Sequence, residues 1–179
     1  MDQQQVILVN EKNEQIGSME KMLVHQQGLL HRAFSIFIFD SSGNMLLQKR
    51  SLNKYHGAGL WTNACCSHPA PGEEIYDAAE RRLVEELGFS TDLKEIFSFI
   101  YHSHVENGLI EHEFDHVFVG QYEAPLQINS KEVADYKYLN MEKIKLEINN
   151  KPEMFTSWFK ISFPQIEKWW LLNYIVKKV

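Results

Sequence analysis

The stretch from Trp61 to Gly88, WTNACCSHPAPGEEIYDAAERRLVEELG, concentrates unusual chemistry in one short run of the chain. It carries a thiol, Cys66, and an imidazole, His68, ahead of a segment that ends in the carboxylates Glu85 and Glu86. A thiol, an imidazole and clustered carboxylates are an unusual combination for a segment that only fills a core. We interpret this stretch as the floor of an active site.

The second half of the stretch predicts an amphipathic helix from Glu73 onward. Its apolar residues recur at every fourth position and give one stripe for burial, namely Ile75, Ala79, Leu83 and Leu87. Prolines and Gly72 bend the chain ahead of this helix, and Gly88 is a natural stop.

Working outward, the sequence predicts strands on both sides of this helix. The β-prone runs are Gln5 to Val9, Ile16 to Met19, Phe34 to Phe39, Met45 to Arg50, Glu95 to Val105, Leu109 to Tyr122 and Tyr136 to Leu139. FSIFIF has large apolar residues on both faces, as in a buried sheet, and MLLQKR follows the turn SSGN as its hairpin partner. Further helices are expected over Met141 to Glu147 and from Glu153, with a break or kink at Pro164. We therefore predict one α/β domain over residues 1–179.

Composition narrows the class of protein. The chain has 179 residues, 44% of them hydrophobic and 23% charged, which is typical of one soluble globular domain. A net charge of −6 argues against nucleic acid as a partner, and no apolar run approaches the ~20 residues that a membrane span needs. No secretory signal is apparent. The adjacent Cys65 and Cys66 are poorly placed for a structural disulfide, which favours free thiols and a cytoplasmic location.

Two acidic residues indicate a metal site. Glu111 and Glu113 are two apart on a predicted strand, so both carboxylates face one side, where a cation would relieve their repulsion. His25, His31 and His68 could complete the shell, and imidazoles with carboxylates suit Zn, Mn or Fe better than Mg alone. By spacing, other histidines are equally eligible: His102, His104, His112 and His116. The glutamate pair could equally lie on a solvated face, and the two cysteines could be buried as small apolar residues.

The predicted helix carries a second group of residues that could bind a metal ion. Glu73, Glu85 and Glu86 could gather a Mg ion that in turn binds phosphate oxygens. The matching cations for a phosphate would be Lys21, Arg50, Lys54 and Arg82. The alternative is an ordinary amphipathic helix with a salt-bridged solvent face.

The helical run resembles the Nudix box, G-x5-E-x7-R-E-U-x-E-E-x-G-U. Glu73 and Arg81 match, as do Glu85, Glu86, Gly88 and Phe89, whereas Ser67 stands at the leading Gly. Arg82 replaces the Glu that follows the Arg and removes a carboxylate that hydrolytic Nudix enzymes use for Mg, which argues against hydrolysis. The resemblance implies a Nudix-type α/β/α sandwich with mixed β-sheets and flanking helices.

From about Val6 to about Trp170 the chain resembles one Nudix branch, the type 1 isopentenyl-diphosphate Δ-isomerases. The motifs that carry this likeness are EKMLVH, LLHRAFSIFIFD, QKRSLNKY, WTNACCSHP, IEHEFDHVF and FTSWF. The resemblance implies one divalent ion (Mn, Zn or Mg) held by His25, His31, His68, Glu111 and Glu113. It also implies a second ion, Mg, between Glu86 and the substrate diphosphate, and a diphosphate clamp made of Lys21, Arg50, Lys54 and Arg82.

The same resemblance implies reversible isomerisation of isopentenyl diphosphate to dimethylallyl diphosphate in isoprenoid biosynthesis. Cys66 and Glu113 would be the acid–base pair, Trp158 would offer its π face to a carbocation, and Tyr101 would hydrogen-bond the carboxylate. Cys65 would only pack. The alternatives are a Nudix hydrolase of a nucleoside diphosphate derivative and a non-catalytic binding module. We expect a monomer in the cytoplasm with no membrane partner.

Overall fold

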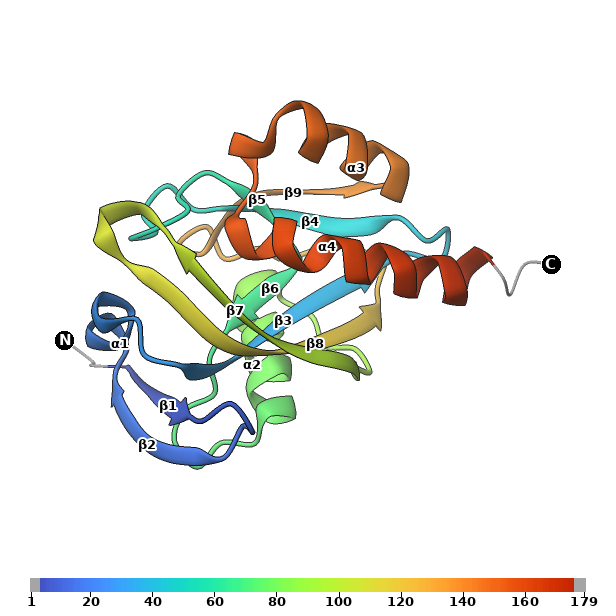
Figure 1. Cartoon of the computed structure of the whole chain (residues 1–179). Coiled ribbons are helices and arrows are strands. Elements are labelled where there is room, and N and C mark those ends of the chain that lie inside the picture. The colour runs from blue at the N-terminus through green and yellow to red at the C-terminus, as the bar shows by residue number, and fades with distance from the viewer. Residues whose placement is uncertain (1–3, 176–179) are drawn as a thin grey trace.

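The computed structural model describes residues 4–175 (Figure 1). Its strands are β1 (Gln5–Val9), β2 (Gln15–Glu20), β3 (His31–Phe39), β4 (Met45–Arg50), β5 (Trp61–Thr62), β6 (Cys65–Ser67), β7 (Lys94–His104), β8 (Ile110–Gln121) and β9 (Val133–Leu139). Its α-helices are α1 (Lys21–Gln27), α2 (Ile75–Leu87), α3 (Met141–Asn150) and α4 (Ser157–Trp170). Short helical turns occupy Glu106–Gly108, Pro152–Met154 and Leu171–Ile175.

Strand β3 is the centre of a mixed sheet. It runs parallel to β8 along its whole length, from His31 beside Glu113 to Phe39 beside Gln121. Its other edge pairs antiparallel with β1, then β6, then β4. Beyond these, β7 pairs with β8, while β9 and β5 pair with β4. The mixed sheet that the Nudix resemblance implied is confirmed.

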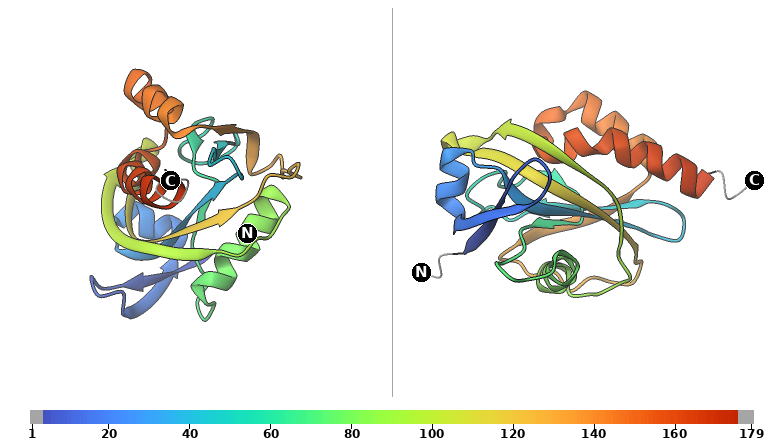
Figure 2. Two further views of the ribbon diagram at one scale, coloured as in Figure 1. Left: turned by 90° about the vertical axis from the view of Figure 1, so that its right-hand side faces the viewer. Right: turned by 60° about the horizontal axis from the view of Figure 1, so that its bottom comes forward.

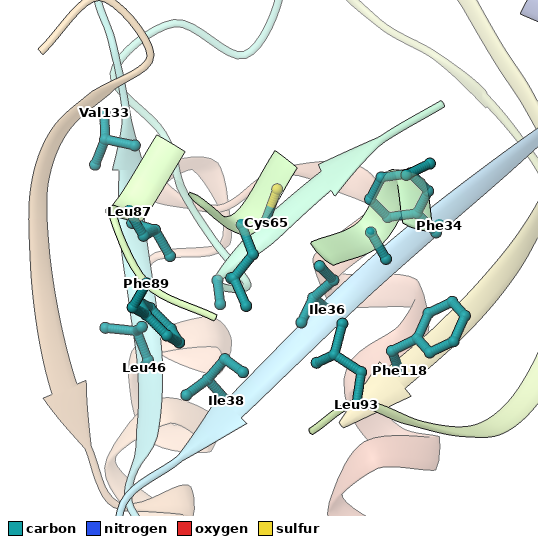
Figure 3. Packing of buried hydrophobic residues seen from close by; sticks show 14 residues of the cluster. Phe34, Ile36, Ile38, Leu46, Cys65, Leu87, Phe89, Leu93, Phe118 and Val133 are labelled. Atoms are coloured by element: carbon teal, nitrogen blue, oxygen red, sulfur yellow. The ribbon is translucent and has the colours of Figure 1, made fainter. Parts of the chain in front are cut away.

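Two cores form because side chains of β3 alternate between the faces of the sheet. Phe34, Ile36 and Ile38 pack against the apolar stripe of α2, in the cluster that Figure 3 shows. Phe37 and Phe39 point the other way and pack with residues of α4 such as Phe159. Figure 2 shows α2 and α4 on opposite sides of the strands, which is the predicted sandwich. Burying each of these large side chains contributes about 2 kcal/mol.

The predicted elements are present, most with ends shifted by one to three residues. Gly88 ends α2 at φ 76°, and a side chain there would lie 2.6 Å from the Gln127 carbonyl oxygen, so this stop requires glycine. The predicted hairpin of β3 with β4 pairs only at Phe39 and Met45, since β3 departs to pair with β6. Of the break or kink expected at Pro164, the break is wrong, because α4 is continuous from Ser157 to Trp170 and packs on the sheet through Phe159 and Phe163. The kink stays a prediction.

No helix within residues 4–175 is long and apolar enough to cross a bilayer.

Candidate active site

Strand register brings three predicted site residues into one row. Tyr101 on β7 lies opposite Glu113 on β8, and Glu113 lies opposite His31 on β3. Glu111 is two residues before Glu113 and therefore faces the same side. On the other edge of β3, β6 carries Cys66 and leads into His68. Residues far apart in the sequence thus meet on one face of the sheet.

Five of the predicted ligands form one buried cluster. Each of them offers an atom within 4.8 Å of the atoms of all the others, and together they are His25, His31, His68, Glu111 and Glu113. The His68 Nε2 atom lies 2.9 Å from Glu113 Oε1 and 3.1 Å from His31 Nε2. The His25 Nε2 atom lies 3.3 Å from Glu111 Oε2.

The tautomers of His25 and His31 indicate that a cation would bind inside the five-residue cluster. The Nδ1–H of His25 donates to the Lys21 carbonyl at 2.7 Å, and the Nδ1–H of His31 donates to the Leu29 carbonyl at 2.9 Å. In the neutral rings, Nε2 therefore presents a lone pair to the cluster. His25 Nε2 and Glu111 Oε2 are buried without hydrogen-bond partners among the described residues. Convergent lone pairs need a positive charge between them, and this donor set has the composition and geometry of a divalent metal site.

The electrostatics of the cluster agree with this demand for positive charge. Burial opposes charging of His25, yet the negative charge of the nearby Glu111 raises the pKa of His25. Burial also opposes ionisation of Glu113, but contact with His31, whose Nε2 atom lies 3.5 Å from Oε1, lowers the pKa of Glu113 to about 2. Burial, reinforced by nearby cations, keeps the pKa of His68 well below its usual value, so this ring stays neutral, as a metal ligand must.

The two predicted proton-transfer groups face one cavity. Tyr101 donates from its hydroxyl to Glu113 Oε2 at 2.6 Å, while Oε1 of the same carboxylate faces the histidines. The Cys66 thiol lines this cavity and lies 3.8 Å from Asn63 Oδ1. Burial raises the pKa of Cys66 to about 12, so the thiol carries its proton at neutral pH. Its neighbour Cys65 is fully buried in the α2 core, as expected for a residue that only packs.

The predicted cations lie around the same cavity. Its lining includes Lys21, Arg50, Lys54 and Arg82, together with Trp158. The Arg50 guanidinium lies over the Trp158 ring, 5.0 Å from the centroid. Lys54 pairs with the Glu132 carboxylate, a partner that the sequence did not indicate. An anionic group entering the cavity would therefore meet several positive charges at once.

Three carboxylates in and just before α2 form ion pairs with arginines of this helix. Glu73 accepts two hydrogen bonds from Arg81, at 2.7 and 2.9 Å, and Glu85 contacts Arg81 and Arg82. For Glu73 and Glu85 the structure therefore matches the alternative to a Mg site, which was an ordinary amphipathic helix with a salt-bridged solvent face. Glu86 is buried, accepts from Arg82 at 2.5 Å, and lies outside the five-residue cluster. Its role with a second ion stays a prediction.

The other histidines separate from the cluster. His102 and His104 are exposed on β7, His112 donates to the Gly28 carbonyl, and His116 contacts Asn13 and Glu95. Sequence reasoning missed His56, which is buried with its Nε2 atom 2.7 Å from Glu111 Oε1. This histidine lies in the irregular loop before β5, where no periodicity marks a side chain as buried.

Comparison with known proteins agrees with the fold. A NUDIX domain matches residues 29–159, so the chain belongs to the Nudix family. A Deinococcus radiodurans protein of known structure, DR0079, shares the fold with a TM-score of 0.68 at 20% identity, over 82% of this chain and 90% of its own.

Within the Nudix family, the chain belongs with the isopentenyl-diphosphate Delta-isomerases. It is 52% identical to isopentenyl-diphosphate Delta-isomerase 2 of Photorhabdus laumondii, over 92% of this chain and 96% of that protein. It is 48% identical to the isopentenyl-diphosphate Delta-isomerase of Serratia proteamaculans, over 92% of this chain and 94% of that protein.

Proposed function

We propose that the chain is a single Nudix isomerase domain that interconverts isopentenyl diphosphate and dimethylallyl diphosphate in isoprenoid biosynthesis. The observation that carries this proposal is one cavity lined by a thiol, a carboxylate, an indole and four cationic side chains. The close relationship to isopentenyl-diphosphate Delta-isomerases supports the same substrate. Lys21, Arg50, Lys54 and Arg82 bind the diphosphate and leave the alkenyl chain directed at the thiol and the carboxylate.

The reaction moves a double bond by one position and needs no net gain or loss of protons. One of the two groups, Cys66 or Glu113, adds a proton to the terminal alkene carbon. The other removes a proton from the carbon two positions away, and the reverse reaction exchanges their roles. Positive charge develops at the tertiary carbon between these events, beside the indole of Trp158. The Arg50 guanidinium already lies over the Trp158 ring, which supports the capacity of this ring to stabilise a cation.

Tyr101 keeps Glu113 oriented for its part in proton transfer. Burial raises the pKa of the Tyr101 hydroxyl well above its usual value, so it remains a hydrogen-bond donor. The carboxylate is thereby held at Oε2 by the phenol while Oε1 faces His31 and His68. A divalent ion (Mn, Zn or Mg) held by the five-residue cluster would withdraw electron density from Glu113 and tune its acidity. Glu86, together with the diphosphate, would hold a second ion, Mg.

Two observations disfavour the alternative functions. The Arg82 guanidinium contacts both Glu85 and Glu86, so it lies where a Nudix hydrolase would place a further metal-binding carboxylate. A binding module would have no need of a thiol and a buried carboxylate at the same cavity. The free cysteines agree with work in the cytoplasm, and we propose that the chain acts as a monomer.

Replacement of the two neighbouring thiols tests the proposal. We expect Cys66→Ala to lose roughly 10²- to 10⁴-fold in turnover of isopentenyl diphosphate, as expected for a general acid or base. Cys65→Ala is the matched control, since it removes a thiol one residue away that faces the α2 core. Wild-type turnover in a folded Cys66→Ala variant would remove Cys66 from the mechanism.

A further inference from the structure

His56 contacts the five-residue cluster through Glu111 but is not one of its five members. Its Nε2 atom lies 2.7 Å from Glu111 Oε1, and its ring is buried. Its Nδ1 atom is also buried and has no hydrogen-bond partner among the described residues. The carboxylate can only accept, so the ring proton is on Nε2 and is donated to Glu111. This is the opposite tautomer to that of His25 and His31.

We propose that His56 is a positioning residue that orients Glu111 for the metal; this inference rests on the proposed metal site. The bond to Oε1 fixes the plane of the carboxylate and leaves Oε2 directed at His25 Nε2, 3.3 Å away. Without it, Glu111 would be free to rotate and would lose a charge-assisted hydrogen bond. Partners that orient metal ligands in this way typically change metal affinity by 10- to 100-fold.

The contacts of His56 also connect the five-residue cluster to the rest of the cavity. Its backbone carbonyl accepts a hydrogen bond of 3.0 Å from Arg50, and its ring meets Trp158 edge to face with centroids 5.6 Å apart. Arg50 in turn lies over Trp158. His56 therefore contacts Glu111 of the five-residue cluster, Arg50 of the proposed diphosphate clamp and the Trp158 ring. This multiple contact explains why a residue outside any regular element is held in one orientation.

Two substitutions of His56 by amides test the inference, because their side chains differ in whether they are long enough to donate to Glu111. In His56→Gln the amide N–H₂ can occupy the place of Nε2 and donate to Glu111, whereas in His56→Asn it is one methylene too short. Affinity for Zn²⁺ alone is measured by competition with a chelator on the full chain, after thermal melts confirm that each variant folds. We expect His56→Asn to bind Zn²⁺ roughly 10- to 100-fold more weakly than the wild type, and His56→Gln to recover most of that loss. His104→Asn, on the exposed side of β7, is the control for a distant histidine.

Wild-type affinity in His56→Asn would overturn the inference. Equal weakening in both variants would also overturn it, because it would mean that the imidazole itself is needed, as for a direct ligand. His25→Ala separates this inference from the metal site on which it rests. Unchanged Zn²⁺ affinity in His25→Ala would refute the five-residue site itself, while loss there with no effect in His56→Asn would refute only the role of His56.

Discussion

Replacing Tyr101 with Phe removes one hydroxyl and leaves the rest of the site in place. The lost bond is a 2.6 Å hydrogen bond to Glu113 Oε2, and both groups are buried. The ring itself can stay, because it stacks on Phe99 with centroids 5.6 Å apart. A hydrogen bond to a charged, buried acceptor contributes about 1.5–3 kcal/mol. At about 1.4 kcal/mol for each factor of ten, this corresponds to a loss of roughly 10- to 150-fold in kcat if the bond is needed to orient Glu113.

The assay is turnover of isopentenyl diphosphate at saturating substrate and metal. Tyr138→Phe is the matched control, since its hydroxyl also donates a 2.6 Å bond, to the Tyr122 carbonyl, but lies on β9 outside the cavity. We expect Tyr138→Phe to leave kcat unchanged. Wild-type kcat in a folded Tyr101→Phe variant would refute the role of this bond, as would an equal loss in the control.

Trp158→Phe is expected to keep partial activity and Trp158→Ala little, because phenylalanine retains a π face for the cation; equal steady-state rates in the two variants would exclude a cation–π role. Glu113→Gln should lose both bound metal and turnover, since one carboxylate oxygen faces the histidines and the other faces Tyr101; unchanged metal content by elemental analysis would contradict this placement. Glu73→Gln tests the ion pair with Arg81, which lowers the pKa of Glu73 below the ordinary 4.5. Its contribution to stability, about 0.5–1 kcal/mol, should be present above pH 4.5 and disappear as the pH falls through the lowered pKa of the folded state. Chemical denaturation of both proteins at pH 7 and pH 3 measures it, and a constant difference in unfolding free energy would mean that the pair is not responsible.

Local patterns in the sequence predicted most of the fold. The fourfold stripe of α2 and the apolar run of β3 are strong signals because each reports directly which face is buried. Of the break or kink expected at Pro164, the break is absent because the helix-breaking tendency of proline is local, whereas aromatic packing holds α4 on the sheet. The divergence of β3 from β4 after one residue pair is likewise set by the competing strand β6, which no local pattern reveals.

Site residues that belong to family motifs could be predicted from the sequence, whereas a site residue in an irregular loop could not. Spacing alone left His102 and His116 as eligible as His31, and only the family motifs chose among them. The parallel register of β3 and β8 supplies the physical reason, since it places His31 beside Glu113. His56 had no such signal, because its burial depends on a loop that folds back over Trp158.

Proton NMR of the metal-supplemented protein with isopentenyl diphosphate in deuterated buffer tests the proposed reaction most directly. We expect dimethylallyl diphosphate to appear with deuterium in its methyl group, since the added proton comes from a group that exchanges with solvent. Release of phosphate without isomer would contradict isomerisation and indicate a hydrolase. An unchanged substrate spectrum, with metal bound, would contradict catalysis on this substrate altogether.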